Sequence, residues 1–148
     1  MVAGDEFDLA VLSAADYESV LVLWRQAGLH IRPAGRDSAE QFARQLAGGT
    51  QTVLGLRAAG TLVAVAVVTH DGRKGWINRL AVHPDFRRRG AGKRLIAEAE
   101  RLLHAQGIGI IAALIEDWNA PSLALFQGAG YTLHADIHYL TKRDNDGV

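Results

Sequence analysis

The segment with the clearest chemical potential is a run of cations that ends in two glycines just before a helical pattern. Its sequence is RRRGAGK, residues 87–93. The first N–H groups of a helix have no partner inside the helix, and the helix dipole places about half a positive charge there. Gly90 and Gly92 have no side chain that would keep an anion from those N–H groups. The pattern therefore predicts a phosphate site, to which Arg88, Arg89 and Lys93 add charge-assisted hydrogen bonds.

Two other phosphate-binding motifs fit this segment less well. A P-loop requires a glycine five residues before Gly92 and a Ser or Thr after Lys93, where the chain has Arg87 and Arg94. A dinucleotide-binding fingerprint requires its glycines directly after a strand and an acidic residue about twenty residues further on, and neither is present. The alternative to a phosphate site is a solvated basic loop in front of a helix.

The periodicity of the rest of the chain predicts the elements that would position this segment. Helices are expected at residues 14–27, 37–46, 92–104 and 121–127. Strands are expected at residues 7–11, 52–57, 62–69, 76–82 and 108–115, with two short strands or one bent strand at residues 131–140. Residues 144–148 are expected to be a flexible tail. This order of elements predicts a mixed α/β sheet with helices on both faces.

The composition limits the classes of function. A chain of 148 residues is the size of one domain, so residues 1–148 are interpreted as a single domain. Sixteen Lys and Arg residues balance sixteen Asp and Glu residues, which disfavours nucleic acid and acidic membranes as partners. The chain has no cysteine, which excludes disulfides and a thiol nucleophile. Since no signal pattern or membrane-length apolar run is present, we expect a cytoplasmic protein.

Two motifs in the second half of the chain resemble those of the GNAT superfamily of N-acetyltransferases. The acetyl-CoA motif of that family is Arg or Gln, two residues, Gly, one residue, then Gly or Ala, and Arg87, Gly90 and Gly92 match it. Residues 119–131 are similar to a second motif, in which an Asn begins a helix that ends in a Gly-Phe or Gly-Tyr pair. The resemblance covers about residues 50–140.

This resemblance implies an α/β (α+β) GNAT fold, with a mostly antiparallel, splayed central sheet of about six to seven strands. It implies acetyl-CoA as the acyl donor, with the pantetheine arm between the fourth and fifth strands and the pyrophosphate at the start of the following helix. The residues that it assigns to coenzyme binding are Leu80, Ala81, Val82, Arg87, Arg88, Arg89, Gly90, Ala91, Gly92, Lys93, Asn119 and Phe126. The implied reaction is acetyl transfer to a primary amine of a small molecule, an amino acid or a peptide or protein.

The catalytic groups of the family are only partly matched. Many relatives have a tyrosine that protonates the departing thiolate, and the matching residue here is Phe126; some have a carboxylate on the fifth strand, and the matching residue is Leu114. Glu116 is a candidate base beside that position. Tyr131 and Tyr139 are candidate replacement acids, with packing of both rings against the sheet as the alternative.

The acceptor side of the site is expected near the loop between the first two helices. His30, Arg32 and Arg36 lie in that loop, and two arginines suit an acceptor that carries a carboxylate, although a solvated loop is the alternative. Trp118 is an exposed candidate beside Asn119. Asn78 and Arg79 flank the predicted position of acetyl transfer on the strand at residues 76–82. Because side chains alternate along a strand, at most one of the two is expected to face the acceptor.

Three further expectations concern metal, function and assembly. His134 and His138 would share one face of an extended segment, but without a third ligand no metal site is predicted. The alternative to an enzyme is an acyl-CoA-binding regulatory module with weak or no catalysis, which Phe126 and Leu114 motivate. The sequence leaves the assembly open, and a homodimer is one form that it allows.

Overall fold

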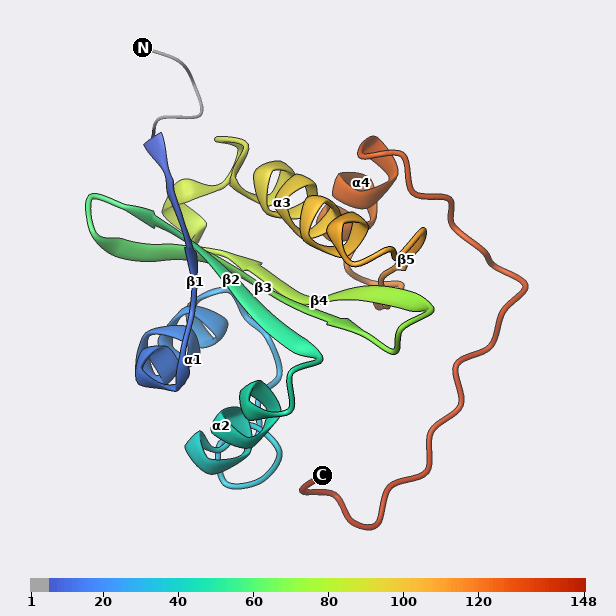
Figure 1. The fold of residues 1–148 in the computed structure, drawn as a ribbon, viewed down its shortest axis with the longest axis horizontal. Coiled ribbons are helices and arrows are strands. Elements are labelled where there is room, and N and C mark those ends of the chain that lie inside the picture. Colours follow the sequence, from blue (N-terminus) through green and yellow to red (C-terminus); the bar gives the residue numbers. More distant parts are fainter. Residues whose placement is uncertain (1–5) are drawn as a thin grey trace.

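Five strands form one sheet in the order β1-β2-β3-β4-β5 (Figure 1). The structure is a computed structural model that describes residues 6–148. The strands are β1 (Asp8–Val11), β2 (Gln51–Ala58), β3 (Thr61–His70), β4 (Lys74–Val82) and β5 (Ile110–Ala112). Neighbouring strands from β1 to β4 are antiparallel, whereas β4 and β5 are parallel. The α/β fold class and the mixed sheet are therefore as predicted.

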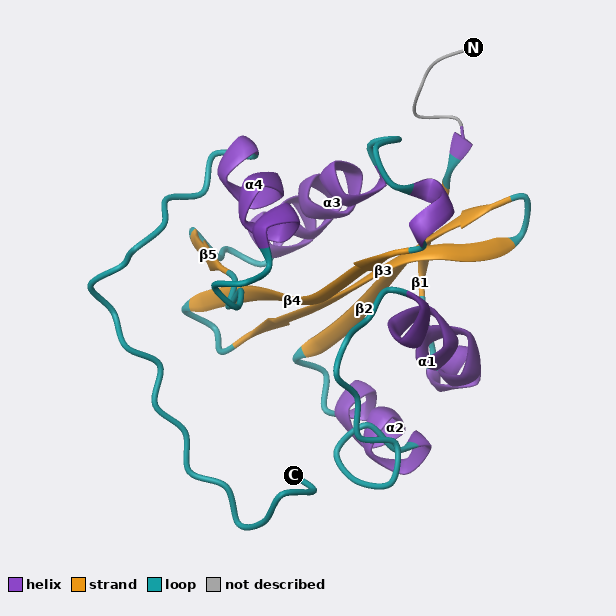
Figure 2. Cartoon of the chain, turned by 180° about the vertical axis from the view of Figure 1, so that it is seen from behind, coloured by secondary structure: helices purple, strands orange, loops and turns teal. Residues whose placement is uncertain are grey.

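Two helices cover each face of the sheet (Figure 2). On one face lie α1 (Tyr17–Gln26) and α2 (Ala39–Ala47), preceded by the short 3-10 helix η2 (Ala14–Asp16); on the other lie α3 (Ala91–Ala105), α4 (Ala120–Gly128) and the short 3-10 helix η3 (Pro84–Phe86). Each face has its own buried apolar cluster, because the central strands are apolar on both sides. Within residues 6–148, no helix combines the length and the apolar composition that a membrane crossing requires.

The sheet opens between β4 and β5. The two strands pair only from Lys74 with Ile110 to Trp76 with Ala112, so residues 77–82 of β4 have no partner on that side. The predicted strand at residues 108–115 was too long, because the chain diverges from β4 after Ala112. The opening exposes one backbone edge of β4 between the helices of both faces.

A bulge interrupts β4 within this open stretch. Val65 pairs with Ala81 and Val67 pairs with Asn78, so two residues of β4 stand opposite one residue of β3. Arg79, one of the two, has a φ of 51°, in the left-handed region that non-glycine residues seldom adopt. The alternation of side chains along β4 is therefore broken beside Asn78.

The sheet has five strands and not the expected six to seven, because residues 131–140 form no strand. The chain leaves the body after Tyr131 and runs as an extended segment around the open side of the sheet (Figure 1). We call residues 132–146 the C-terminal arm; every one of them is exposed. The predicted strand pattern is present there, but no neighbouring strand supplies the hydrogen bonds that would complete it.

Candidate active site

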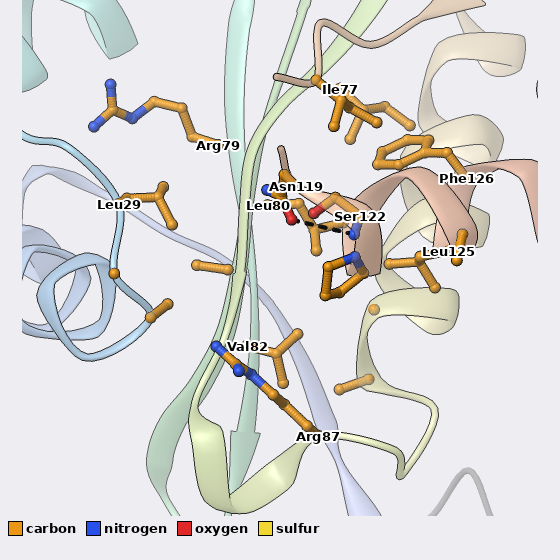
Figure 3. Close-up of a pocket in the computed structure, with 18 of the residues that line it drawn as sticks. Leu29, Ile77, Arg79, Leu80, Val82, Arg87, Asn119, Ser122, Leu125 and Phe126 are labelled. Carbon is orange, nitrogen blue, oxygen red and sulfur yellow. Dashed lines mark hydrogen bonds between the residues drawn. The ribbon is translucent and has the colours of Figure 1, made fainter. Parts of the chain in front are cut away.

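A cleft of about 1050 Å³ occupies the opening between β4 and β5. Its walls come from β4, the start of α3 and the start of α4 (Figure 3). Arg79 lies on one side of β4, whereas Asn119, Leu125 and Phe126 lie on the other. The residues assigned to coenzyme binding that line this cleft are Leu80, Ala81, Val82, Arg87, Arg88, Gly90, Ala91, Gly92, Lys93, Asn119 and Phe126. Arg89 is not part of its lining.

The N-terminus of α3 is open to the cleft. Gly90 is the N-cap with a φ of 82°, and no side chain caps this helix, whereas Ser38 caps α2 and Asn119 caps α4. Arg88 also has a left-handed φ of 62°. The N–H groups of the first turn thus remain available at the positive end of the helix dipole, which favours an anion there.

The four cations beside this helix start have different surroundings. Arg87, Arg88 and Lys93 line the cleft, and within the described part of the chain none of them forms an ion pair. Arg89 instead pairs with Glu6 at 2.8 Å and lies 4.9 Å from the centre of the Phe86 ring. Three cations are therefore free for a ligand, and the fourth ties the loop to the N-terminal segment.

Gly92 also allows α3 and α4 to approach each other. A Cβ atom at Gly92 would lie 2.7 Å from Cδ2 of Leu125. A small residue at position 92 is therefore required by packing as well as by access to the open N–H groups.

Asn119 caps α4 with only one of its two polar groups. Its Oδ1 accepts the N–H of Ser122 at 3.3 Å, which leaves its amide NH₂ available for a ligand (Figure 3).

The two candidate acids lie outside the cleft. The Tyr131 ring packs edge-to-face on Phe126 at 5.1 Å, and its hydroxyl donates to Glu100 at 2.9 Å. Burial raises the pKa of Tyr131, and the contact with Glu100 raises it further. Tyr139 is in the C-terminal arm and is 65% exposed. Phe126 itself is buried and presents only an aromatic ring to the cleft.

The candidate acceptor residues and the candidate base Glu116 separate into three groups. His30, Arg36, Glu116 and Trp118 line the cleft. Asn78 lines a smaller neighbouring hollow of about 300 Å³, and Arg32 lines neither. Within residues 6–148, no three His, Asp or Glu side chains gather as metal ligands would.

Sequence reasoning missed a buried ion pair between β4 and the loop that joins α1 to α2. Asp37 is 8% exposed; its Oδ1 lies 3.4 Å from Nη1 of Arg79, and its Oδ2 accepts the N–H of Arg32 at 2.7 Å. The Arg79 guanidinium also lies 4.3 Å from the centre of the Trp24 ring. Burial lowers the pKa of Arg79, and the attraction of Asp37 opposes this shift. These contacts tie the bulge of β4 to the loop between α1 and α2.

The strand pattern could not have revealed this pair. Alternation allowed only one of Asn78 and Arg79 to face the acceptor side, but the bulge brings both to the same hollow. Asp37 was expected to begin the second helix, whereas Ser38 is its N-cap and Asp37 turns inward. The signal in the sequence that could have suggested this ion pair was Asp37, an acidic residue directly after Arg36.

Comparison with known proteins decides the family. The profile of the Acetyltransferase (GNAT) family matches residues 18–131. The chain belongs to this family. Among solved structures, it is similar to PaiA N-acetyltransferase from Thermoplasma acidophilum in complex with coenzyme A, with a TM-score of 0.77, 18% identity, and 86% of this chain and 91% of that chain covered.

Two further solved structures share the GNAT fold. One is an aminoglycoside acetyltransferase from an uncultured soil metagenomic sample in complex with sisomicin, with a TM-score of 0.77, 14% identity, and coverage of 97% of this chain and 100% of that chain. The other is a predicted acetyltransferase with acetyl-CoA from Clostridium acetobutylicum, with a TM-score of 0.74, 14% identity, and coverage of 91% and 96%. At these identities the likeness supports the fold of this GNAT chain and not its acceptor.

Proposed function

We propose that this GNAT protein transfers an acetyl group from acetyl-CoA directly to the primary amine of a small molecule, an amino acid or a peptide. The observation that supports this most strongly is the uncapped start of α3, which faces the cleft beside three unpaired cations, Arg87, Arg88 and Lys93. These groups match the charge of a pyrophosphate. Acetyl-CoA-bound and CoA-bound proteins of the same fold support this choice of ligand.

The open edge of β4 suits the rest of the coenzyme. An extended pantetheine arm has amide groups that can pair with backbone N–H and C=O groups at Leu80 and Val82, in the place that a longer β5 would take. The free amide NH₂ of Asn119 is a further donor towards this arm. The thioester would then lie near the bulge, between the coenzyme side and the acceptor side.

The chemistry requires a neutral amine at the thioester carbon. An amine with a pKa near 10.4 is mostly protonated at neutral pH, so a base has to take up a proton, either directly or through water. Glu116 lines the cleft and is our candidate for that base. The amine nitrogen attacks the carbonyl carbon, and the C–S bond then breaks. The nitrogen loses a proton to become an amide nitrogen, and the departing thiolate of coenzyme A takes up a proton from solvent. We expect a β4 backbone N–H at the bulge to stabilise the oxyanion.

The test is thiol release from acetyl-CoA across a panel of amines. Because the chain has no cysteine, a thiol reagent reports coenzyme A without background from the protein. We expect amine-dependent release, and release that is about tenfold slower in an Arg88→Gly variant at limiting acetyl-CoA. Absence of release with every amine, together with intact acetyl-CoA binding, would contradict the enzymatic proposal.

That outcome would favour the alternative, an acyl-CoA-binding regulatory module. Two observations motivate it: Phe126 cannot donate a proton, and Leu114 has no carboxylate on the cleft wall. A solvent-protonated thiolate removes the need for an acid, since a thiol pKa near 8.5 makes thiolate a tolerable leaving group. We therefore retain the enzyme as the proposed function.

A further inference from the structure

The smaller hollow of about 300 Å³ lies beside the cleft, between the sheet and the helices α1 and α2. Trp24 of α1, Phe42 of α2 and Val67 of β3 give it an apolar lining. Arg36 and Arg79 line both the hollow and the cleft, so the two spaces adjoin at these arginines. Arg79 lies on the opposite side of β4 from the start of α4 (Figure 3). A molecule with two polar ends can therefore place one end in each space.

The charges around the hollow do not cancel. Arg36 and Arg79 share one carboxylate, because Oδ2 of Asp37 lies 3.8 Å from Nε of Arg36 and Oδ1 lies 3.4 Å from Nη1 of Arg79. Among the described residues, no other Asp or Glu lines the hollow, so its ionised side chains carry a net charge of +1. Charges in a partly buried site require partners. The hollow is therefore suited to a ligand group with one negative charge.

Hydrogen-bond donors without acceptors converge on the same hollow. Within residues 6–148, Nε1 of Trp24, Nε of Arg36 and Nε of Arg79 are buried and form no hydrogen bond. The three side chains are neighbours, since the Arg79 guanidinium lies 4.3 Å from the centre of the Trp24 ring and shares Asp37 with Arg36. Native structures pair nearly all buried donors, because a donor left without an acceptor is costly. A carboxylate supplies both the missing negative charge and two acceptor oxygens.

We propose that the hollow binds the carboxylate of the acceptor, whose amine then lies in the cleft beside the bulge of β4. This inference rests on the proposed acetyl transfer and narrows its acceptor to an amino acid or another small amine that carries a carboxylate. The apolar side chains of Phe42 and Val67 suit the carbon atoms between the two polar ends. A diamine is disfavoured, because Arg36 and Arg79 would repel its second ammonium group. Arg79 and Trp24 thus take the part that the sequence pattern gave to Arg32.

The first test follows the indole N–H of Trp24 by NMR in nitrogen-labelled protein, with and without coenzyme A. The chain has three tryptophans, and the Trp24 signal is the one that disappears in Trp24→Phe. The probes are the standard L-amino acids, β-alanine and γ-aminobutyrate, each beside its carboxamide. We expect a saturable shift of the Trp24 signal with at least one amino acid, and about tenfold weaker binding of its carboxamide. A Trp24 signal that no carboxylate moves would overturn the proposal.

The second test locates the binding with variants, measured by calorimetric titration of the amino acid that binds. Arg36→Gln removes a partly exposed cation and should weaken binding about tenfold. Trp24→Phe keeps an aromatic ring but removes the indole N–H, and should weaken binding about fivefold. Arg44→Gln removes an exposed cation of α2 outside the hollow and should leave affinity within about twofold. If Trp24→Phe fails to fold, Arg36→Gln against Arg44→Gln decides, and equal losses in these two would overturn the proposal.

The third test uses turnover, which separates this inference from the proposed function. With acetyl-CoA saturating, kcat/KM for the amino acid should exceed that for its carboxamide by about tenfold, and Arg36→Gln should remove most of that preference. Putrescine, a diamine, should be a poorer acceptor than the amino acid. Equal kcat/KM for the amino acid and its carboxamide would overturn the role of the hollow and leave acetyl transfer intact. Carboxylate-dependent binding without thiol release from any amine would support the carboxylate site and contradict the transfer.

Discussion

Arg88 and Arg89 are neighbours in the chain, yet only Arg88 lines the cleft. Arg88→Gly removes one cation while keeping the left-handed backbone that Arg88 has at a φ of 62°. We expect acetyl-CoA affinity to fall about tenfold, as for the loss of one partly solvated charge-assisted hydrogen bond. Arg89→Gln, which breaks the pair with Glu6, should leave affinity within about twofold. Calorimetric titration measures both, and equal losses would contradict the assignment of Arg88.

Phe126 and Tyr131 allow a test of the missing acid. Phe126→Tyr places a phenol on the cleft wall and should raise kcat by no more than about 10²-fold if protonation of the thiolate limits the rate. Tyr131→Phe removes the hydroxyl that donates to Glu100 and should lower stability by about 1 kcal/mol without changing kcat. Steady-state kinetics and urea unfolding measure the two effects. A large kcat loss in Tyr131→Phe would instead identify a relocated acid.

Arg36 and Arg32 come from the same loop but differ in position. Arg36 lines the cleft, and its Nε lies 3.8 Å from Oδ2 of Asp37 but makes no hydrogen bond, whereas Arg32 is exposed and contributes its backbone N–H to Asp37. We expect Arg36→Gln to raise KM for acceptors with a carboxylate by about tenfold, and Arg32→Gln to leave KM unchanged. Amide-capped acceptors are the control. If capped and uncapped acceptors lose equally, Arg36 does not bind a carboxylate.

At the scale of elements, the helices and the central strands followed from their periodicity. The expected helix at residues 92–104 is α3, and Ser13 and Asp16 form a capping box at the start of the helical segment expected at residues 14–27. These features depend on local spacing and local hydrogen bonds, which a sequence displays directly. The proposed phosphate-binding turn also lies within one local segment, so its residues could be named before the fold was known.

Features that depend on two distant segments could not be predicted in this way. The bulge in β4 is a register shift in its pairing with β3, and no residue type in β4 indicates that shift. The pair between Asp37 and Arg79 joins residues 42 positions apart and requires the bulge to turn Arg79 towards the loop. The early end of β5 likewise depends on where the sheet diverges.

The close approach of α3 and α4 should appear as coupling between Gly92 and Leu125. Gly92→Ala gains about 0.5 to 1 kcal/mol of helix stability but forces Cδ2 of Leu125 to move from 2.7 Å. In the Leu125→Ala background that conflict is absent, so Gly92→Ala should stabilise there and be neutral or destabilising otherwise. A double-mutant cycle by urea unfolding measures the difference. Identical effects in both backgrounds would show that Gly92 has no packing requirement.

At the scale of the whole molecule, the strand pattern of the C-terminal arm led to an overestimate of the number of strands in the sheet. The alternation of apolar residues was read correctly, since it runs from Leu133 to Tyr139, but a strand also requires an edge to pair with. Periodicity describes one segment and cannot say whether its partner belongs to the same chain. Periodicity alone therefore does not fix the number of strands in the sheet.

Binding of the coenzyme should stabilise the whole domain, because the cleft has walls on β4, α3 and α4. A ligand at 100 times its Kd adds about 2.7 kcal/mol to the free energy of unfolding, which for a chain of this size raises Tm by about 5 to 10 °C. We expect that shift with acetyl-CoA in calorimetry. Pantetheine, which lacks the phosphates, should give a much smaller shift at equal concentration, because the open N–H groups of α3 and the cations beside them would stay unoccupied. In Arg88→Gly the Tm shift with acetyl-CoA should move towards the pantetheine value. Equal shifts for both ligands with the unmodified protein would instead assign the binding energy to the pantetheine part of the coenzyme alone, and would contradict the role proposed for the start of α3.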